Sequence, residues 1–386
     1  MALDWTSLET QFAELQAQLQ RAPERLRAHG NPAPGGSPRE LLYGRGKARL
    51  YRYLPLPGKR TSLPLLIVYA LVNRPSMADL APGRSLVQAL LERGVDVHLI
   101  EWDDPGILDA NRDLGSYITQ DLHGCVSWLE ARGGAVNLMG ICQGGTFALC
   151  YAALEPSRVR SLITTVTPVD FHTPDDHLGR LLRDVDLDLL GAGNVSGDAL
   201  NGLFLRLKPY RLLTQKYIDV LPQLGDPEAT ANFLRMERWI FDSPDLAGRA
   251  LAEFARKFYR ENRFRQGGLE IGGRPVDLAT ICVPVLNVYA SDDHLVPPAS
   301  SRALAELTAS TDYTEVAVPG GHIGIYVGSK ARTTVASTIG SWLASRVGKA
   351  GVSGGRKSPP EGRSGDQPTG AEGRSNEKRG SRRKPR

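Results

Sequence analysis

Short apolar segments alternate with amphipathic segments through the first half of the chain. The apolar segments have the length of β-strands and lie at residues 63–70, 95–102, 135–139 and 159–166. The segments between them repeat apolar residues at helical spacing, at residues 85–93, 117–132 and 146–154. Strands that alternate with helices are typical of a parallel sheet. We therefore predict an α/β fold, with a further strand at residues 48–54, where apolar and polar residues alternate.

The pattern changes between residues 170 and 280, where no clear strand of a parallel sheet occurs. Residues 231–240 and 246–259 have helical spacing instead. A segment of this kind, inserted between sheet strands, is expected to form a cap over an active site. Its aromatic residues could line a binding surface, although helix core is the commoner explanation for aromatic residues at this spacing: Phe233, Trp239, Phe241, Phe254 and Phe258.

The strand pattern returns at residues 283–290 and 314–318, and a closing helix is predicted over 331–346. The predicted organisation is therefore an N-terminal helix and linker (1–38), the first part of the α/β core (39–169), the cap (170–280), the second part of the core (281–348) and a basic tail (349–386). The tail contains too few apolar residues to offset the entropy of ordering, so we predict it to be disordered.

Composition narrows the class of protein. The 386 residues carry a net charge of +5, but residues 351–386 contain ten basic and four acidic residues and account for this excess. The remainder is nearly neutral, which argues against a nucleic-acid-binding face on the folded body. There is no run of about 18 apolar residues, no secretory signal pattern, and no metal or disulfide spacing among the four cysteines. We expect a cytoplasmic protein without a membrane span or a bound metal.

A candidate nucleophile follows the third apolar segment. The strand at 135–139 runs into Gly140-Ile141-Cys142-Gln143-Gly144, and a helix is predicted immediately afterwards. This is the strand–turn–helix pattern of the G-x-S-x-G nucleophile elbow, with Cys142 in place of serine. Gly140 and Gly144 fit the pattern because strand and helix pass close together at such a turn. Taken alone, the five residues are equally consistent with a buried cysteine at a turn, so the residues downstream decide.

The two further groups that a thiol nucleophile needs, an acid and a histidine, follow Cys142 along the chain. Asp293 follows the next-to-last predicted strand, and His322 lies in a glycine-rich turn after the last one. Nucleophile, acid and histidine follow one another in this order in the α/β-hydrolase fold. Asp292 is the alternative acid, although we expect it to cap the turn, and His294 is an alternative base for which a supporting role is favoured. The other histidines are expected to be structural: His98, His123, His172 and His177.

Two backbone N–H groups are candidates for an oxyanion hole. Gln143 follows the nucleophile at the N-terminus of a helix, where the helix dipole favours negative charge. Val72 lies in the loop after the strand at 63–70, which supplies the second donor in α/β-hydrolases. The choice of Val72 is open by one or two positions, and an ordinary strand-to-loop exit is the alternative interpretation.

A thiol nucleophile also favours one class of reaction. Cysteine attacks thioesters readily, and the intermediate is itself a thioester of similar energy, so acyl groups can be passed on reversibly. The residue type therefore indicates acyl transfer from a thioester such as a CoA derivative.

The chain resembles the polyhydroxyalkanoate synthases, and its length and Gln143 resemble the class III catalytic subunit. The resemblance covers residues 40–346 and is carried by five motifs: YALVNRP (Tyr69–Pro75), GICQGGTFALCYAAL (Gly140–Leu154), NFLRMERWIFDSPD (Asn232–Asp245), YASDDHLVPP (Tyr289–Pro298) and PGGHIG (Pro319–Gly324). The basic tail has no counterpart in it.

The resemblance implies an α/β-hydrolase fold and the polymerisation of (R)-3-hydroxyacyl-CoA, short-chain for class III, with release of CoA. Cys142 would carry the acyl group or the growing chain, His322 would deprotonate it, and Asp293 would orient His322 or help to activate the 3-hydroxyl of the substrate. It further implies a homodimer that works with a second, E-type subunit on cytoplasmic polyester granules, without a cofactor.

Two other interpretations remain open. A cysteine-dependent hydrolase or thioesterase of the same fold would release free acid and make no polymer. A granule-binding scaffold with an inactive site would need no chemistry, and the intact set of Cys142, Asp293 and His322 argues against it.

Overall fold

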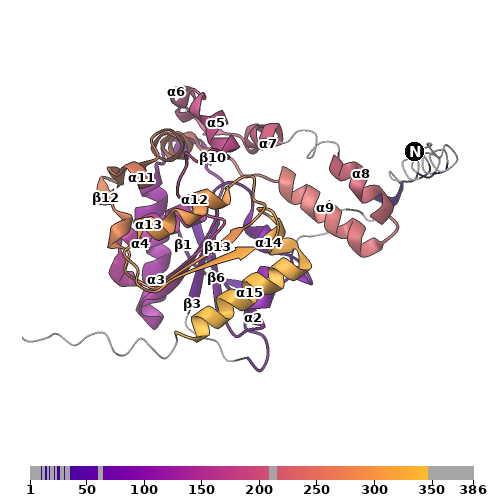
Figure 1. Ribbon diagram of the computed structural model, residues 1–386, viewed down its shortest axis with the longest axis horizontal. Helices are drawn as coiled ribbons and strands as arrows, with labels where there is room; N and C mark the ends of the chain where they lie inside the picture. Colours follow the sequence, from indigo (N-terminus) through magenta and orange to yellow (C-terminus); the bar gives the residue numbers. More distant parts are fainter. Residues whose placement is uncertain are drawn as a thin grey trace, which may run out of the picture. The chain divides into compact units, whose positions relative to one another are not determined.

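The computed structural model describes residues 10, 14, 17, 21, 24–26, 30, 35–59, 64–207 and 215–346. Most of the predicted N-terminal helix and the whole predicted tail, 349–386, lie outside these residues. Within the described part of the chain, eight strands form one central sheet with helices on both faces (Figure 1). No helix of this part is long and apolar enough to cross a membrane.

The central sheet has the strand order β1-β2-β6-β3-β7-β8-β13-β14. Its strands are β1 (Arg39–Arg45), β2 (Ala48–Tyr53), β3 (Pro64–Val68), β6 (Asp96–Trp102), β7 (Val136–Ile141), β8 (Val159–Thr165), β13 (Val285–Ala290) and β14 (Tyr313–Val318). β1, β2 and β6 pair antiparallel, and every pair from β6 to β14 is parallel. The predicted α/β fold with a mostly parallel sheet is therefore confirmed.

Strand β3 shows why the sequences of the sheet strands are continuous runs of apolar residues. Leu65 and Ile67 pack on one face of the sheet, with the buried residues of α2 (Leu86–Leu91) and α15 (Ser329–Ala344). Leu66 and Val68 pack on the other face, with the residues of α3 (His123–Gly133) and α4 (Gln143–Leu154). Because helices cover both faces, neither set of alternating positions meets water.

Strand β1 was not predicted from the sequence. It is an edge strand whose positions are exposed or half-buried, so it lacks the apolar alternation that marks β2.

The helix predicted over 246–259 begins later than expected. Leu246 and Ala247 instead form a two-residue strand, β10, that pairs with Asn194 and Val195 of β9.

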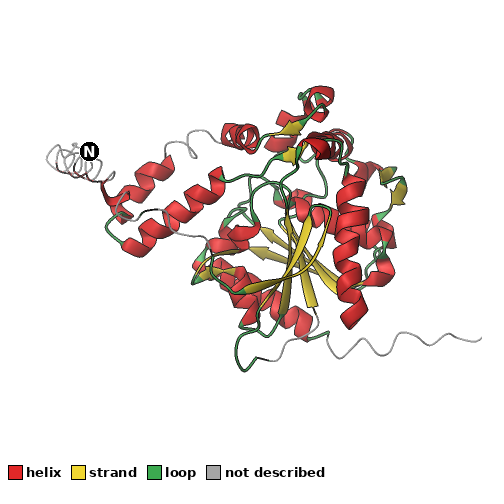
Figure 2. Ribbon diagram, turned by 180° about the vertical axis from the view of Figure 1, so that it is seen from behind, coloured by secondary structure: helices red, strands yellow, loops and turns green. Residues whose placement is uncertain are grey.

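The segment between β8 and β13 consists mainly of helices (Figure 2). They are α5 (His177–Arg183), α6 (Leu187–Gly191), α7 (Gly197–Leu207), α8 (Lys216–Val220), α9 (Pro227–Phe241), α10 (Gly248–Phe254), the π-helix η7 (Ala255–Arg260) and α11 (Arg263–Gln266). Its strands β9 (Asn194–Val195), β10 (Leu246–Ala247), β11 (Leu269–Ile271) and β12 (Arg274–Val276) form separate two-stranded sheets. We call this segment the cap.

The remaining short elements connect the layers. They are η1 (Pro75–Ala78), β4 (Asp79–Ala81), β5 (Arg84–Ser85), η2 (Ile107–Asp109), the π-helix η3 (Ser116–Leu122), η4 (Pro156–Arg158), η6 (Leu221–Gln223), η8 (Leu278–Thr280), α12 (Pro298–Arg302), α13 (Leu304–Leu307) and α14 (Gly324–Val327). The loops after β3, β7, β13 and β14 leave the same edge of the sheet, because these strands are parallel.

Candidate active site

The predicted nucleophile lies on a strained turn between β7 and α4. Cys142 has φ 54° and ψ −125°, a backbone conformation that non-glycine residues rarely adopt. Its N–H donates to the Thr165 carbonyl at 3.0 Å, and its carbonyl accepts from Gly145 N at 2.8 Å. These bonds hold the residue in the strained conformation, and the half-buried thiol lines a pocket.

The glycines of the elbow are required by close packing. A Cβ on Gly144 would lie 2.1 Å from the Val68 carbonyl oxygen, and one on Gly140 would lie 2.2 Å from the Gly145 Cα. Both contacts are with backbone and cannot be relieved by turning a side chain. Strands β3 and β7 can therefore approach helix α4 closely enough to form the site only because these positions lack a side chain.

Asp293 and His322 meet directly although they lie 29 positions apart in the chain. The Asp293 Oδ2 is 2.7 Å from the His322 Nδ1, and both residues are buried. The other oxygen of Asp293 accepts from the N–H groups of Leu295 at 2.9 Å and Val296 at 3.0 Å. The carboxylate is thus held by its own loop, and it can orient the imidazole ring as the acid of a triad does.

Asp292 has a different environment from its neighbour. It is exposed, and its Oδ2 accepts from Gly320 N at 3.2 Å and from the Ser291 hydroxyl at 3.1 Å. The side chain therefore joins the turns after β13 and β14 at the surface, and it does not contact the imidazole.

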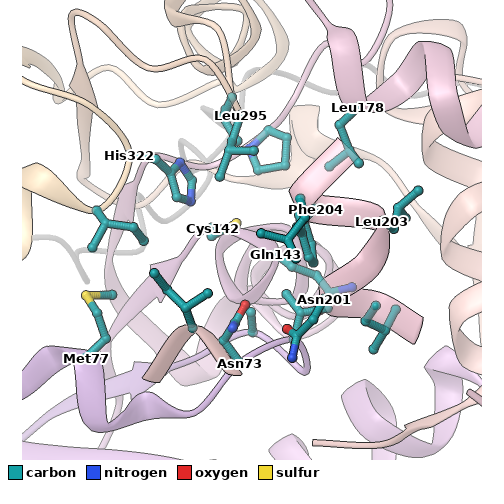
Figure 3. A pocket seen from close by; sticks show the side chains of 18 of the residues that line it. Asn73, Met77, Cys142, Gln143, Leu178, Asn201, Leu203, Phe204, Leu295 and His322 are labelled. Carbon is teal, nitrogen blue, oxygen red and sulfur yellow. The ribbon is translucent and has the colours of Figure 1, made fainter. Parts of the chain in front are cut away.

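The electrostatics of His322 suit a proton acceptor. Burial alone would lower its pKa, but the carboxylate of Asp293 and the sulfur of Cys142 outweigh burial, and the pKa lies well above the usual value of 6.5. The ring is turned toward Cys142 (Figure 3). A ring with a raised pKa can accept and hold a proton from a neighbouring nucleophile.

The loop after β3 is tied to the elbow by Gln143. The Leu71 N–H donates to the Gln143 Oε1 at 2.9 Å, and the Gln143 side chain is buried. Because the N–H of Leu71 is occupied, Val72 is the next donor along the loop. Val72 and Gln143 both line the pocket that contains Cys142, as the two predicted oxyanion donors must.

Cap residues hold this same loop from the other side, a feature that sequence reasoning missed. Asn73, with φ 60°, donates from Nδ2 to the Ser243 hydroxyl at 3.0 Å, and Ser243 donates to the Asn201 Oδ1 at 2.6 Å. The Trp239 Nε1 donates to the Arg74 carbonyl at 2.7 Å. We call the Asn73–Ser243–Asn201 chain the latch. The asparagine before Arg-Pro was its only signal in the sequence, since asparagine tolerates a positive φ.

The pocket has a volume of about 640 Å³, and its lining is predominantly apolar. Cys142 and His322 lie on the sheet side, while the apolar wall comes from cap helices (Figure 3). That wall includes Leu178, Leu182, Leu203, Phe204, Met236 and Ile240. Such a lining suits an acyl chain.

The five cap aromatic residues singled out from the sequence divide between the two interpretations given above. Trp239 and Phe254 line the pocket. Phe258 is fully buried in the core, Phe233 packs against a small separate cluster, and Phe241 is 46% exposed.

The histidines outside the site have partners elsewhere. His294, the alternative base, lines the pocket wall. The predicted acid, Asp293, contacts His322. The rings of the other four histidines have partners other than the site residues: His98 the Asp96 carbonyl, His123 the Tyr151 hydroxyl, His172 the backbone carbonyl of Tyr259 and His177 the Arg180 guanidinium. Among the described residues, no group of three or more His, Cys, Asp or Glu side chains is placed to hold a metal ion.

Comparison with known proteins identifies similar chains. Residues 64–329 match the family described as the alpha/beta hydrolase fold. The Poly(3-hydroxyalkanoate) polymerase subunit PhaC of Allochromatium vinosum is 51% identical over 81% of this chain and 90% of its own. The proteins of the same name from Thiocystis violacea and from a Synechocystis species are 48% and 46% identical, over 81% of this chain and 89% and 85% of theirs. A monoacylglycerol lipase structure from Paleococcus ferrophilus has 18% identity and a TM-score of 0.48, over 74% of this chain and 96% of that one.

Proposed function

Because the chain belongs to the family of poly(3-hydroxyalkanoate) polymerase PhaC subunits, we propose that it polymerises (R)-3-hydroxyacyl groups from CoA thioesters into a polyester, with release of CoA. The observation that carries the proposal at the level of the site is the buried contact between Asp293 and His322 beside the elbow thiol of Cys142. Substrates with short acyl chains, such as 3-hydroxybutyryl-CoA, are proposed from the resemblance to class III.

The proposed reaction has an acylation step and a chain-extension step. His322 takes the thiol proton of Cys142, and the thiolate attacks the thioester carbonyl and expels CoA as its thiolate, which takes up that proton. The N–H groups of Val72 and Gln143 bind the oxyanion that forms during the attack. In the extension step, His322 accepts the proton of a 3-hydroxyl as its oxygen attacks the acyl group on sulfur, so that an ester bond forms and a thiol is released.

The apolar cap wall supports synthesis over hydrolysis. A pocket of about 640 Å³ with an apolar lining can hold an acyl chain, and it presents little to bind a water near the thioester. The intermediate on Cys142 can then last until a hydroxyl arrives. The thioester to Cys142 also keeps the growing chain attached to the protein. We therefore propose that the enzyme works at the surface of cytoplasmic polyester granules.

We further propose that this chain works as a homodimer with a second, E-type subunit. The names of the similar proteins describe PhaC as a subunit of a polymerase, which supports a partner of this kind. If full activity requires the second subunit, CoA release by the isolated chain should be slow, or show a lag, until the partner is added.

The test is to mix the purified chain with (R)-3-hydroxybutyryl-CoA, with and without a class III partner subunit, and to follow CoA release and polymer together. We expect both products, and we expect both to be lost in Cys142→Ala. CoA release with free hydroxy acid alone would show a thioesterase, the principal alternative. A Cys142→Ala variant that retained CoA release would disprove the proposed nucleophile.

A further inference from the structure

A second and much smaller cavity adjoins the reaction pocket. Its volume is about 10 Å³, which is the space that a single water molecule occupies. The two cavities share Pro168, Tyr259, Leu295 and Val296 in their walls. Three of the residues that line the small cavity carry a side-chain oxygen: Asp176, Tyr259 and Ser300.

Asp176, which lines this cavity, has an unmatched acceptor. The residue is 4% exposed, and its Oδ1 accepts from Gly179 N at 2.8 Å. Its Oδ2 is buried and has no hydrogen-bond partner among the described residues. A buried carboxylate oxygen without a partner is costly, and a bound water is the usual way to satisfy it. Ser300 offers a further hydroxyl, whose oxygen already accepts from Val169 N at 3.3 Å.

Tyr259 connects the small cavity with the reaction pocket. Its ring is fixed by an edge-on contact with Phe171, at 5.0 Å between ring centroids. Burial raises the pKa of its hydroxyl well above 10, and the nearby charges of Asp176 and Cys142 raise it further. Tyr259 thus lines both cavities, and its hydroxyl stays protonated as a hydrogen-bond donor.

We propose that the small cavity holds one water molecule, bound by Asp176, which orients the Tyr259 hydroxyl to bind the 3-hydroxyl of the acyl group. This inference rests on the proposed function and adds a substrate contact to it. Tyr259 contacts the substrate, while Asp176 is a positioning residue that acts through the water.

The polarity of the hydrogen bonds supports this assignment. Burial raises the pKa of the Asp176 carboxyl. In its ionised form the carboxylate only accepts, so the water donates one hydrogen to the Asp176 Oδ2 and the other to the Tyr259 oxygen. The Tyr259 hydrogen then points into the pocket and is donated to the 3-hydroxyl oxygen. The hydrogen of the 3-hydroxyl is left for His322, the group that must remove it. The thioester carbonyl does not need Tyr259, because Val72 and Gln143 offer it two N–H groups.

The experiment compares two substrates that differ by one hydroxyl. With enzyme in excess, the first release of CoA is timed for (R)-3-hydroxybutyryl-CoA and for butyryl-CoA, and the ratio of the two rates is taken. We expect Tyr259→Phe to lower this ratio by about fivefold to tenfold, the effect of one lost hydrogen bond. We expect Asp176→Asn to lower it by about twofold to fivefold, because the amide can donate to the water and reverse its orientation.

Tyr326→Phe is the matched control. Tyr326 is also a buried tyrosine of the pocket wall, but its hydroxyl donates to the Thr165 Oγ1 at 2.6 Å. Its loss should change both rates alike and leave the ratio unchanged. The rate with butyryl-CoA also shows whether each variant is folded.

Three results would count against the inference or against its premise, and they can be told apart. If Tyr259→Phe slows both substrates equally, Tyr259 does not recognise the 3-hydroxyl. If Tyr259→Phe lowers the ratio and Asp176→Asn does not, the water relay is wrong. If the unmodified protein releases CoA from neither substrate, even with a partner subunit, the proposed function itself has failed.

Discussion

The two halves of the pocket are built in different ways. On the sheet side, Cys142, Asp293 and His322 lie on turns that follow parallel strands, and backbone hydrogen bonds fix each turn. On the cap side, the wall consists of apolar side chains on helices, joined to the sheet side by the latch and by the bond from Trp239 to Arg74.

This difference indicates that the two sides of the pocket have different roles. Reacting groups must be held to within a fraction of an ångström, which a sheet edge with bonded turns provides. An acyl chain has few polar groups to recognise, and a wall of side chains can accommodate it by shape. We therefore expect changes on the sheet side to alter rate or folding severely, and changes on the cap side to have smaller effects.

The largest loss of activity should come from Asp293→Asn. The amide cannot fix the imidazole in the productive state, and turnover should fall by about 10³-fold to 10⁴-fold, as in other triads. Asp292→Asn is the matched control, because Asp292 is adjacent but bonds only to surface groups. It should cost less than about threefold. Steady-state CoA release measures both, and equal losses would mean that the acid has been misassigned.

The largest loss of stability should come from Gly144→Ala. The new Cβ would meet the Val68 carbonyl oxygen at 2.1 Å, so strand and helix must separate, at a cost of more than about 4 kcal/mol. Gly202→Ala, in cap helix α7, meets nothing within 4 Å and should instead stabilise by up to about 1 kcal/mol. Denaturant unfolding compares the two. A well-folded Gly144→Ala variant would show that the elbow is less tightly packed than described.

His322 should make stability depend on pH in a defined direction. Its folded pKa lies well above 6.5, so the protonated ring stabilises the fold fully below about pH 6.5, and this contribution is lost as pH rises through the raised pKa. The gap in unfolding free energy between the unmodified protein and His322→Gln should therefore be larger at pH 6 than at pH 9, by about 1.4 kcal/mol for each unit of elevation. A gap that widened with pH would contradict the raised pKa.

The smallest effect should come from Ser243→Ala on the cap side. This change breaks both hydrogen bonds of the latch and loosens the loop that carries Val72. We expect a fall in kcat of about fivefold with little change in KM, because Val72 is the proposed oxyanion donor and such a donor acts mainly in the transition state. Ser196→Ala is the control, since the Ser196 hydroxyl accepts from Ala199 N within its own helix turn. A change in KM alone would assign the latch to binding.

Local sequence was enough to predict the elbow and the alternation of strands and helices. The signals for Gly140, Cys142 and Gly144 lie within five residues, and the conformation that they require is set by neighbouring backbone. Buried parallel strands such as β3 are also marked locally, because both of their faces must be apolar. Strand β1 escaped prediction because an exposed edge strand carries no such mark.

Other features required the folded chain. Asp292 and Asp293 are adjacent in the sequence, which left Asp292 open as an alternative acid. The turn after β13 directs Asp292 to Gly320 and Asp293 to His322. The latch joins residues between 42 and 170 positions apart, and Asp176 and Tyr259 line one small cavity although they lie far apart in the chain. No local pattern encodes such arrangements. The sequence by itself therefore determined the fold class and the candidate groups. Their distances, partners and protonation depended on packing between distant segments, since burial and neighbouring charge arise only when those segments meet.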